Sequence, residues 1–169
     1  MLPHDGGSEE SDRPVVNLVR FGTVEPELLE GLARSVEGFL RLIGEEGIVQ
    51  PAVLRSRRCL PAGLPDQYQG DFLLSHLEVV PGNIAVGITD VVFYDPNLPR
   101  KVFGYGSGGR SILSTFRFRR ESESRRILQE RLNKEIIKIL SMACDLPICS
   151  DRQCIVMYHR FMEDIDKNT

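Results

Sequence analysis

The feature that most constrains the fold is a long amphipathic segment near the end of the chain, which runs into a proline and a set of cysteines. Apolar residues recur there about once per helical turn, at Leu128, Leu132, Ile136, Leu140 and Ala143. This spacing predicts a helix with one buried stripe, which Ser122 or Ser124 can cap and which must end before Pro147. Cysteines then recur at every fifth residue, at Cys144, Cys149 and Cys154. We expect a helix over about residues 123–145 that leads into a loop rich in thiols.

Length and composition indicate one domain. The chain has 169 residues, of which 41% are hydrophobic, and this is enough for a sizeable core. Residues 1–14 are acidic and poor in apolar groups, so we expect a disordered leader followed by a single domain over residues 15–169. The apolar runs are far shorter than the roughly 20 residues of a membrane-spanning helix, and the first residues lack the apolar stretch of a secretion signal. We therefore expect a cytoplasmic protein that does not enter a membrane.

Charge argues against nucleic acid as a partner. The net charge is −3, and although five arginines crowd into residues 117–126, Glu121 and Glu123 interleave with them. Aromatic groups that could stack on bases are limited there to Phe116 and Phe118. The exposed end of a strand followed by the start of a helix accounts better for this span.

Hydrophobic periodicity predicts strands and helices in the first half of the chain. We expect folding to begin with a strand at Val15. Residues 26–43 have apolar positions close to a 3.6-residue period and predict an amphipathic helix with Pro26 in its first turn. A strand over residues 47–54 and a helix capped by Asp66 are expected to follow.

The second half is predicted to be richer in strands before the long helix. Residues 84–94 are almost continuously apolar, which is typical of a strand buried on both faces. Segments 102–105 and 111–119 flank a glycine turn and predict a hairpin. A short helix is expected over about residues 158–166. Strands and helices that alternate and then give way to helix and loop indicate an α+β fold with a mixed, twisted sheet.

The segment that begins at Lys138 resembles a known active site. Residues 138–149 are Lys-Ile-Leu-Ser-Met-Ala-Cys-Asp-Leu-Pro-Ile-Cys, and Cys154 follows after four further residues. This frame resembles the active-site helix of archaemetzincins, small zinc-peptidase-like proteins that carry His-Glu-x-x-His-x-x-Gly-x-x-His-Cys and a second cysteine five positions later. Weaker resemblances occur in the family's order at residues 15–22, 67–74, 87–94 and 163–167. The resemblance implies a metzincin-like single domain.

The departures from the family pattern concern the chemistry. The three histidine positions fall on Lys138, Met142 and Ile148, the glutamate on Ile139 and the glycine on Asp145. In the family the histidines hold zinc and the glutamate activates water. An ammonium group repels a zinc ion, and a thioether is a poor ligand for it. We therefore expect no catalytic residues and no metal at the catalytic position.

The resemblance also implies that a peptide-binding cleft persists, because metzincin-like proteins bind an extended peptide by adding it to the edge of the sheet. The expected cleft residues are Val102, Phe103, Gly104, Tyr105, Lys138 and Met142. We expect Ile139, Met142 and Ile148 to fill the space of the metal. Alternatively, Lys138 serves as a point charge that meets a peptide carboxylate.

The cysteines imply a second, structural metal site. In the family Cys149 and Cys154 supply half of a four-thiolate zinc site, and the other half comes from a Cys-x-x-Cys that would lie beyond the last residue of this sequence. Cys144 is a further candidate ligand, and His159 or Asp151 could complete a tetrahedron. The alternative is that the cysteines are unligated thiols.

Together these patterns predict a pseudopeptidase, an archaemetzincin-like protein without a catalytic zinc site that binds a peptide or a partner protein in the remnant cleft. Two alternatives stay open. One is a residual or altered hydrolase activity that uses groups such as Glu135 and Lys138, or a metal bound in a non-standard way. The other is a purely structural protein.

Overall fold

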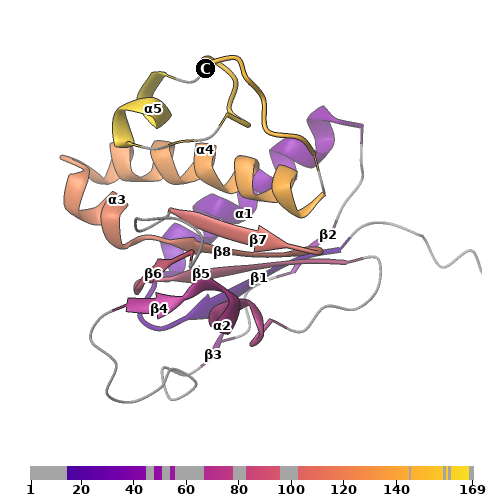
Figure 1. The fold of residues 1–169 in the computed structure, drawn as a ribbon, viewed down its shortest axis with the longest axis vertical. Coiled ribbons are helices and arrows are strands. Elements are labelled where there is room, and N and C mark those ends of the chain that lie inside the picture. Colours follow the sequence, from indigo (N-terminus) through magenta and orange to yellow (C-terminus); the bar gives the residue numbers. More distant parts are fainter. Residues whose placement is uncertain are drawn as a thin grey trace, which may run out of the picture.

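Figure 1 shows the computed structural model of the chain, a β-sheet with helices on both of its faces. It describes residues 15–44, 48–50, 54–55, 67–77, 83–95, 103–144, 146–157, 159 and 161–167. The expected leader, the Asp66 cap and Val102 lie outside the described residues. No helix among those described combines the length and the apolar character that crossing a membrane requires.

The main sheet is mixed, as predicted. Its centre consists of three parallel strands, β1 (Val15–Phe21), β5 (Ile84–Thr89) and β8 (Arg110–Ser114). Two short strands, β2 (Ile48–Gln50) and β3 (Leu54–Arg55), pair in parallel with β1 on one side. At the opposite edge β7 (Gly104–Ser107) pairs antiparallel with β8. The α+β fold class is therefore confirmed.

Two long helices, α1 (Pro26–Leu42) and α4 (Arg125–Ala143), cover one face of this sheet (Figure 1). The predicted cap is present, since the Ser124 hydroxyl accepts a hydrogen bond from the Ile127 amide at 3.3 Å. The predicted stripe of α4 is fully buried at Leu132 and Ile136. It packs against apolar residues of α1 and of the central strands, so this layer holds the larger of two hydrophobic cores. Two short helices flank α4, namely α3 (Phe116–Glu121) before it and α5 (Met162–Lys167) after it.

The other face of the sheet carries a smaller core. Here α2 (Gly70–Leu74) lies beside a separate pair of parallel strands, β4 (Gln67–Gln69) and β6 (Val92–Tyr94). Large apolar side chains from both layers meet in this core, among them Phe21, Leu73, Leu77, Phe93 and Ile112. The sheet is thus buried on both faces, in keeping with the nearly continuous apolar character of β5.

Several predicted boundaries are wrong. Residues 84–94 do not form one strand, because the chain leaves the main sheet after Thr89 and continues as β6 in the second sheet. The Ser114 hydroxyl stabilises this departure by donating to the Val91 carbonyl at 2.7 Å. Residues 67–69 form strand β4 where a helix was expected, and residues 116–121 form helix α3 where a strand was expected.

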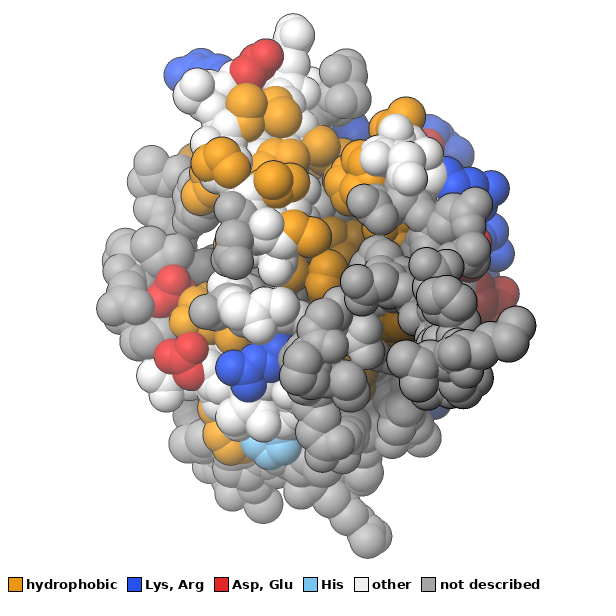
Figure 2. Space-filling view, turned by 90° about the vertical axis from the view of Figure 1, so that its right-hand side faces the viewer, with side chains coloured by type: hydrophobic (Ala, Val, Ile, Leu, Met, Phe, Trp, Pro, Cys, Tyr) orange, Lys and Arg blue, Asp and Glu red, His pale blue; other side chains and the backbone are white. Residues whose placement is uncertain are grey.

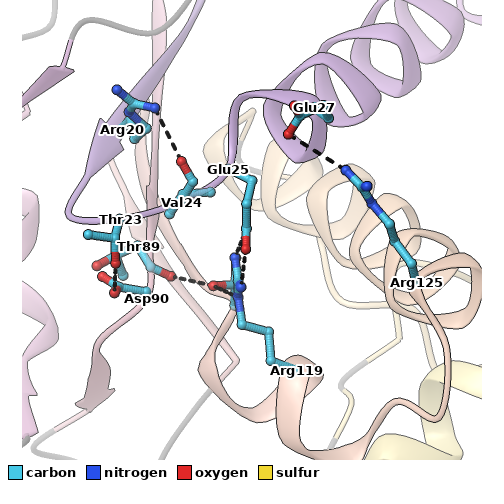
Figure 3. Close-up of polar contacts among 10 residues, drawn as sticks. Arg20, Thr23, Val24, Glu25, Glu27, Thr89, Asp90, Arg119 and Arg125 are labelled. Carbon is cyan, nitrogen blue, oxygen red and sulfur yellow. Dashed lines mark hydrogen bonds and ion pairs between the residues drawn. The ribbon is translucent and has the colours of Figure 1, made fainter.

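A polar network joins the loops at the carboxyl ends of the parallel strands (Figure 3). Arg119 from α3 forms a two-pronged ion pair with Glu25, just before α1, and its Nη1–Oε1 distance is 2.6 Å. This hydrogen bond from Arg119 holds the pKa of Glu25 below its usual value. Thr23 donates to Asp90 at 2.6 Å across the same end of the sheet. These contacts fix α3 against the start of α1.

Candidate functional site

Helix α4 carries Lys138, Ile139 and Met142, three of the residues that the sequence resemblance aligns with the family's catalytic motif. Ile139, aligned with the family's glutamate, is fully buried beneath the edge strand β7. A Cβ atom added to Gly104 would lie 2.4 Å from Ile139 Cδ1, which is closer than real contacts allow. Glycine at position 104 therefore lets β7 approach the helix directly over Ile139. The alkyl group of Ile139 fills most of the space beneath this strand, and Glu135 Oε1 lies at its margin, 3.4 Å from the same added Cβ atom.

Lys138, which the sequence resemblance aligns with the first zinc ligand, belongs to a buried charged cluster. Its ammonium group lies 2.6 Å from Glu135 Oε1, and Lys138 is 7% exposed. The second oxygen of Glu135 lies 2.7 Å from Nδ1 of His159, and both of these side chains are fully buried. We call Glu135, Lys138 and His159 the buried triad. It joins two turns of α4 to the segment that precedes α5.

The buried triad keeps its carboxyl group ionised. Burial by itself raises the pKa of Glu135, because it removes the carboxylate from water, but the charge of Lys138 and the hydrogen bond to His159 outweigh burial and lower it. A buried carboxylate with cationic and hydrogen-bonding partners on both oxygens is internally compensated. A peptide carboxylate that bound to Lys138 would therefore have to compete with Glu135 for its ammonium group.

The other two ligand positions do not line a closed space. Met142 is half-buried, but Ile148 is 58% exposed, so it does not fill the space of a metal as expected. Leu146 nearby is 51% exposed, and Leu42 and Ile43 at the end of α1 are exposed as well. Figure 2 shows this end of the molecule, where hydrophobic side chains gather around a hollow in the upper half of the face. The chain leaves α4 at Cys144 and carries Ile148 outward.

The predicted cleft residues at the start of β7 and directly before it lie on both faces of the sheet. Phe103 is buried against Phe118, with ring centroids 5.0 Å apart, so its side chain belongs to the core. Tyr105 points away from α4 and packs on Gly70 of α2. Its hydroxyl donates to Asp71 at 2.7 Å, which raises the pKa of Tyr105 to about 12. Gly104 thus lies against α4, whereas Phe103 and Tyr105 do not line the expected cleft with their side chains.

The outer edge of β7 exposes backbone groups of two glycines. The Ser114 amide donates to the Phe103 carbonyl at 2.9 Å, so this opposed pair is hydrogen-bonded. Pairs in an antiparallel ladder alternate between hydrogen-bonded and non-hydrogen-bonded. The N–H and C=O groups of Gly104 and Gly106 therefore point away from β8. Among the described strands none pairs with this edge.

The cysteines lie in the segment that follows α4. Cys144 is exposed, Cys149 and Cys154 are half-buried, and none of the three is in a disulfide bond. Within the described ranges no three His, Cys, Asp or Glu side chains are grouped so that they could hold a metal ion. His159, expected as a possible fourth ligand, is bonded to Glu135 instead. Asp151 accepts a hydrogen bond from the Gln153 amide at 2.9 Å and so shapes the loop between the cysteines.

The zinc ion that the family resemblance implies does not fit the residues at the catalytic position. The side chains there are an ammonium group in an ion pair, two isoleucines and a thioether, at Lys138, Ile139, Ile148 and Met142. A catalytic zinc site needs three nitrogen, oxygen or thiolate ligands, and this set supplies none. We therefore derive no reaction step through a metal at this position.

Sequence reasoning did not find the buried triad, although a signal was present. Glu135 stands directly before Ile136 and one helical turn after Leu132, so it falls on the apolar stripe of α4. A carboxylate on a buried stripe needs a partner. Lys138, three residues later on the same side of the helix, was the obvious candidate. His159 could not be assigned in this way, because only the fold brings it near.

Comparisons with known proteins support the fold. No protein-family model matches the chain, and no curated protein matches it either. It is similar in structure to the archaemetzincin of Methanopyrus kandleri, with a TM-score of 0.76 and 24% identity over 95% of this chain and 89% of that one. The archaemetzincin of Archaeoglobus fulgidus, solved in complex with malonate, has a TM-score of 0.71 and 26% identity, over 91% of this chain and 92% of that one. A zinc-dependent peptidase of Methanocorpusculum labreanum has a TM-score of 0.71 and 16% identity, over 90% of this chain and 93% of that one. The chain therefore has the fold of the archaemetzincins.

Proposed function

We propose that this protein is a pseudopeptidase, an archaemetzincin-like protein that binds an extended peptide, or an extended segment of a partner protein, without cleaving it. The observation that carries the proposal is the buried triad. Lys138, which the sequence resemblance aligns with the family's first zinc ligand, is a lysine whose charge is compensated by Glu135. Metal-assisted hydrolysis needs a Lewis acid and an activated water, and the side chains at this position supply neither.

The same cluster weighs against a residual hydrolase that uses Glu135 and Lys138. A general acid or base must come within hydrogen-bond reach of the substrate. Glu135 is fully buried, Lys138 is 7% exposed, and each is the other's partner at 2.6 Å. The charges stabilise the helix and the segment that carries His159, and a substrate would have to displace both.

Peptide binding along β7 does not need the absent catalytic groups. Strand addition uses backbone N–H and C=O groups, and β7 directs those of Gly104 and Gly106 outward. The two-residue turn that ends the strand has positive φ at Gly108 and Gly109, 57° and 75°, which fits the tight hairpins that match the twist of a sheet. We expect this binding to take place in the cytoplasm, where the thiols of the chain stay reduced.

The proposal is tested by panning the purified protein against a library of ten-residue peptides and measuring zinc content and peptide hydrolysis on the same preparation. We expect bound peptides that are recovered intact. In a selected peptide, N-methylation of alternate residues should abolish binding in one register and spare it in the other, because only one set of amides faces β7. Cleavage that a chelator abolishes would overturn the proposal. One zinc per chain without cleavage, lost together with stability on chelation, would instead identify a structural site at Cys149 and Cys154.

A further inference from the structure

A basic hollow lies where the edge strand begins. It is lined by four residues of α3, namely Phe116, Arg117, Arg120 and Glu121. Helix α3 follows β8 directly and lies beside the start of β7 (Figure 1). The whole chain, by contrast, has a net charge of −3.

Arg117 is held in place at this hollow. Its guanidinium group lies 4.3 Å from the ring centroid of Phe103, the residue directly before β7. Its Nε donates to Glu121 at 3.1 Å. A guanidinium group stacked on an aromatic ring and fixed at one nitrogen still presents further N–H groups in a fixed plane. Such a group can meet a carboxylate with little loss of conformational freedom.

Arg120 differs from the other arginines of this region in its partners. Arg119 pairs with Glu25, Arg125 with Glu27, Arg126 with Glu130 and Arg131 with Asp166. Arg120 is exposed, and its contact within the part of the chain that the structure describes is the ring of Phe116, whose centroid lies 5.8 Å away. An exposed arginine over an aromatic ring at the edge of a hollow suits an anionic ligand, because its guanidinium group keeps N–H groups available for a carboxylate.

We propose that Phe116, Arg117 and Arg120 form a carboxylate subsite, which selects peptides with an acidic group at the position that pairs near Gly104. This inference rests on the proposed function, since it names the class of peptide that the edge of β7 takes. An arginine binds a carboxylate through two parallel hydrogen bonds. The contact of Arg117 with Phe103 ties the subsite to the residue directly before Gly104, so a peptide added along β7 would reach it at one of its ends. The carboxylate can belong to an aspartate, a glutamate or the C-terminus of the peptide.

The experiment pans ten-residue peptides on the full chain and compares Arg120→Glu with Arg34→Glu, which makes the same change of charge at an exposed position on α1. We expect an acidic residue to be enriched at one peptide position with the wild type. An acidic peptide should bind about tenfold more weakly to Arg120→Glu and equally well to Arg34→Glu. A peptide with an amidated C-terminus tells the two sources of carboxylate apart, because it keeps its affinity only if a side chain is recognised.

Glu121→Gln provides a test of opposite sign. Removing this carboxylate from the edge of the hollow should strengthen the binding of the acidic peptide severalfold, which damage to the fold would not do. Equal weakening by Arg120→Glu and Arg34→Glu would overturn the subsite, and so would peptides selected without an acidic preference. If no peptide binds at all, both the subsite and the proposed peptide-binding function are overturned. If peptides bind without an acidic preference, only the subsite is overturned.

Discussion

The buried triad and the basic hollow on α3 use the same kinds of side chain to opposite effect. In the triad, a lysine and a histidine meet one carboxylate in a buried site. In the hollow, Arg117 lies over the buried ring of Phe103 and the exposed Arg120 lies over the ring of Phe116. A buried charge that loses its partner destabilises the fold strongly, whereas an exposed ion pair contributes little to stability. The comparison indicates that the charges on α4 contribute to stability, whereas those on α3 are placed where the proposed ligand could reach them.

The largest effect is expected for Glu135→Ala. The change leaves the ammonium group of Lys138 and Nδ1 of His159 in a buried site without their carboxylate, and the free energy of unfolding should fall by about 3–5 kcal/mol. Urea denaturation of the purified variant measures this. Glu130→Ala is the matched control, since it removes an exposed ion pair with Arg126 from the same helix and should cost less than about 1 kcal/mol. Similar losses of unfolding free energy in both variants would contradict the idea that the buried triad contributes more to stability than an exposed ion pair.

A double variant sharpens the same point. Glu135→Gln with Lys138→Met removes both charges while the amide can still bond to His159, so it should be more stable than Glu135→Ala. Urea denaturation under the same conditions compares the two. A double variant that is as unstable as the single one would mean that shape and packing, and not charge compensation, make Glu135 necessary.

Gly104→Ala should have a smaller but clear effect on the contact between β7 and α4. The added methyl group would overlap Ile139 Cδ1 and Cγ1, which we expect to cost about 1–3 kcal/mol of folding free energy. Gly38→Ala is a control of opposite sign, because Gly38 lies inside α1 with nothing within 4 Å of an added Cβ atom. There the better helix propensity of alanine should stabilise the protein slightly. Equal effects at both positions would contradict a close approach at Gly104.

The pH dependence of stability isolates the charge of Glu135. Its pKa in the folded protein lies below the ordinary value of 4.5, so its ionisation stabilises the fold above that value, and this stability is lost as the pH falls below it. The free energy of unfolding, followed from about pH 7 to about pH 3, should therefore fall more steeply in the wild type than in Glu135→Gln. Glu25 and Asp166, whose pKa values are also lowered by arginines, are present in both proteins. Parallel curves would count against an ionised Glu135.

The smallest effect on stability is expected at Arg120. Arg120→Ala removes an exposed side chain, so the free energy of unfolding should change by no more than about 0.5 kcal/mol. Thermal unfolding checks this. A large loss of stability would mean that Arg120 is needed for the fold. Weaker binding by Arg120→Glu could then not be interpreted as the loss of a ligand contact.

Local patterns predicted the helices well where packing and sequence agree. Helix α1 matches its expected span because its apolar period and Pro26 point to the same structure, and Ser124 caps α4 as its sequence position suggests. The hairpin of β7 and β8 follows from its glycine turn. The break between β5 and β6 was missed, because a strand that bends out of one sheet into another keeps its apolar character on both sides of the bend. Similarly, α3 was taken for a strand because aromatic residues suit both structures.

The sequence by itself determined that no histidine set for zinc stands on α4, since the identity of residues 138, 139, 142 and 148 is independent of the fold. It also determined the stripe and the cap that make α4 a helix. Only the tertiary structure decided which contacts the side chains of α4 make. His159 lies 24 positions after Glu135 in the chain, and no local spacing predicts that the two side chains meet. Burial made the difference, because the fold removes Glu135 from water and its carboxylate then requires partners that a solvated one does not.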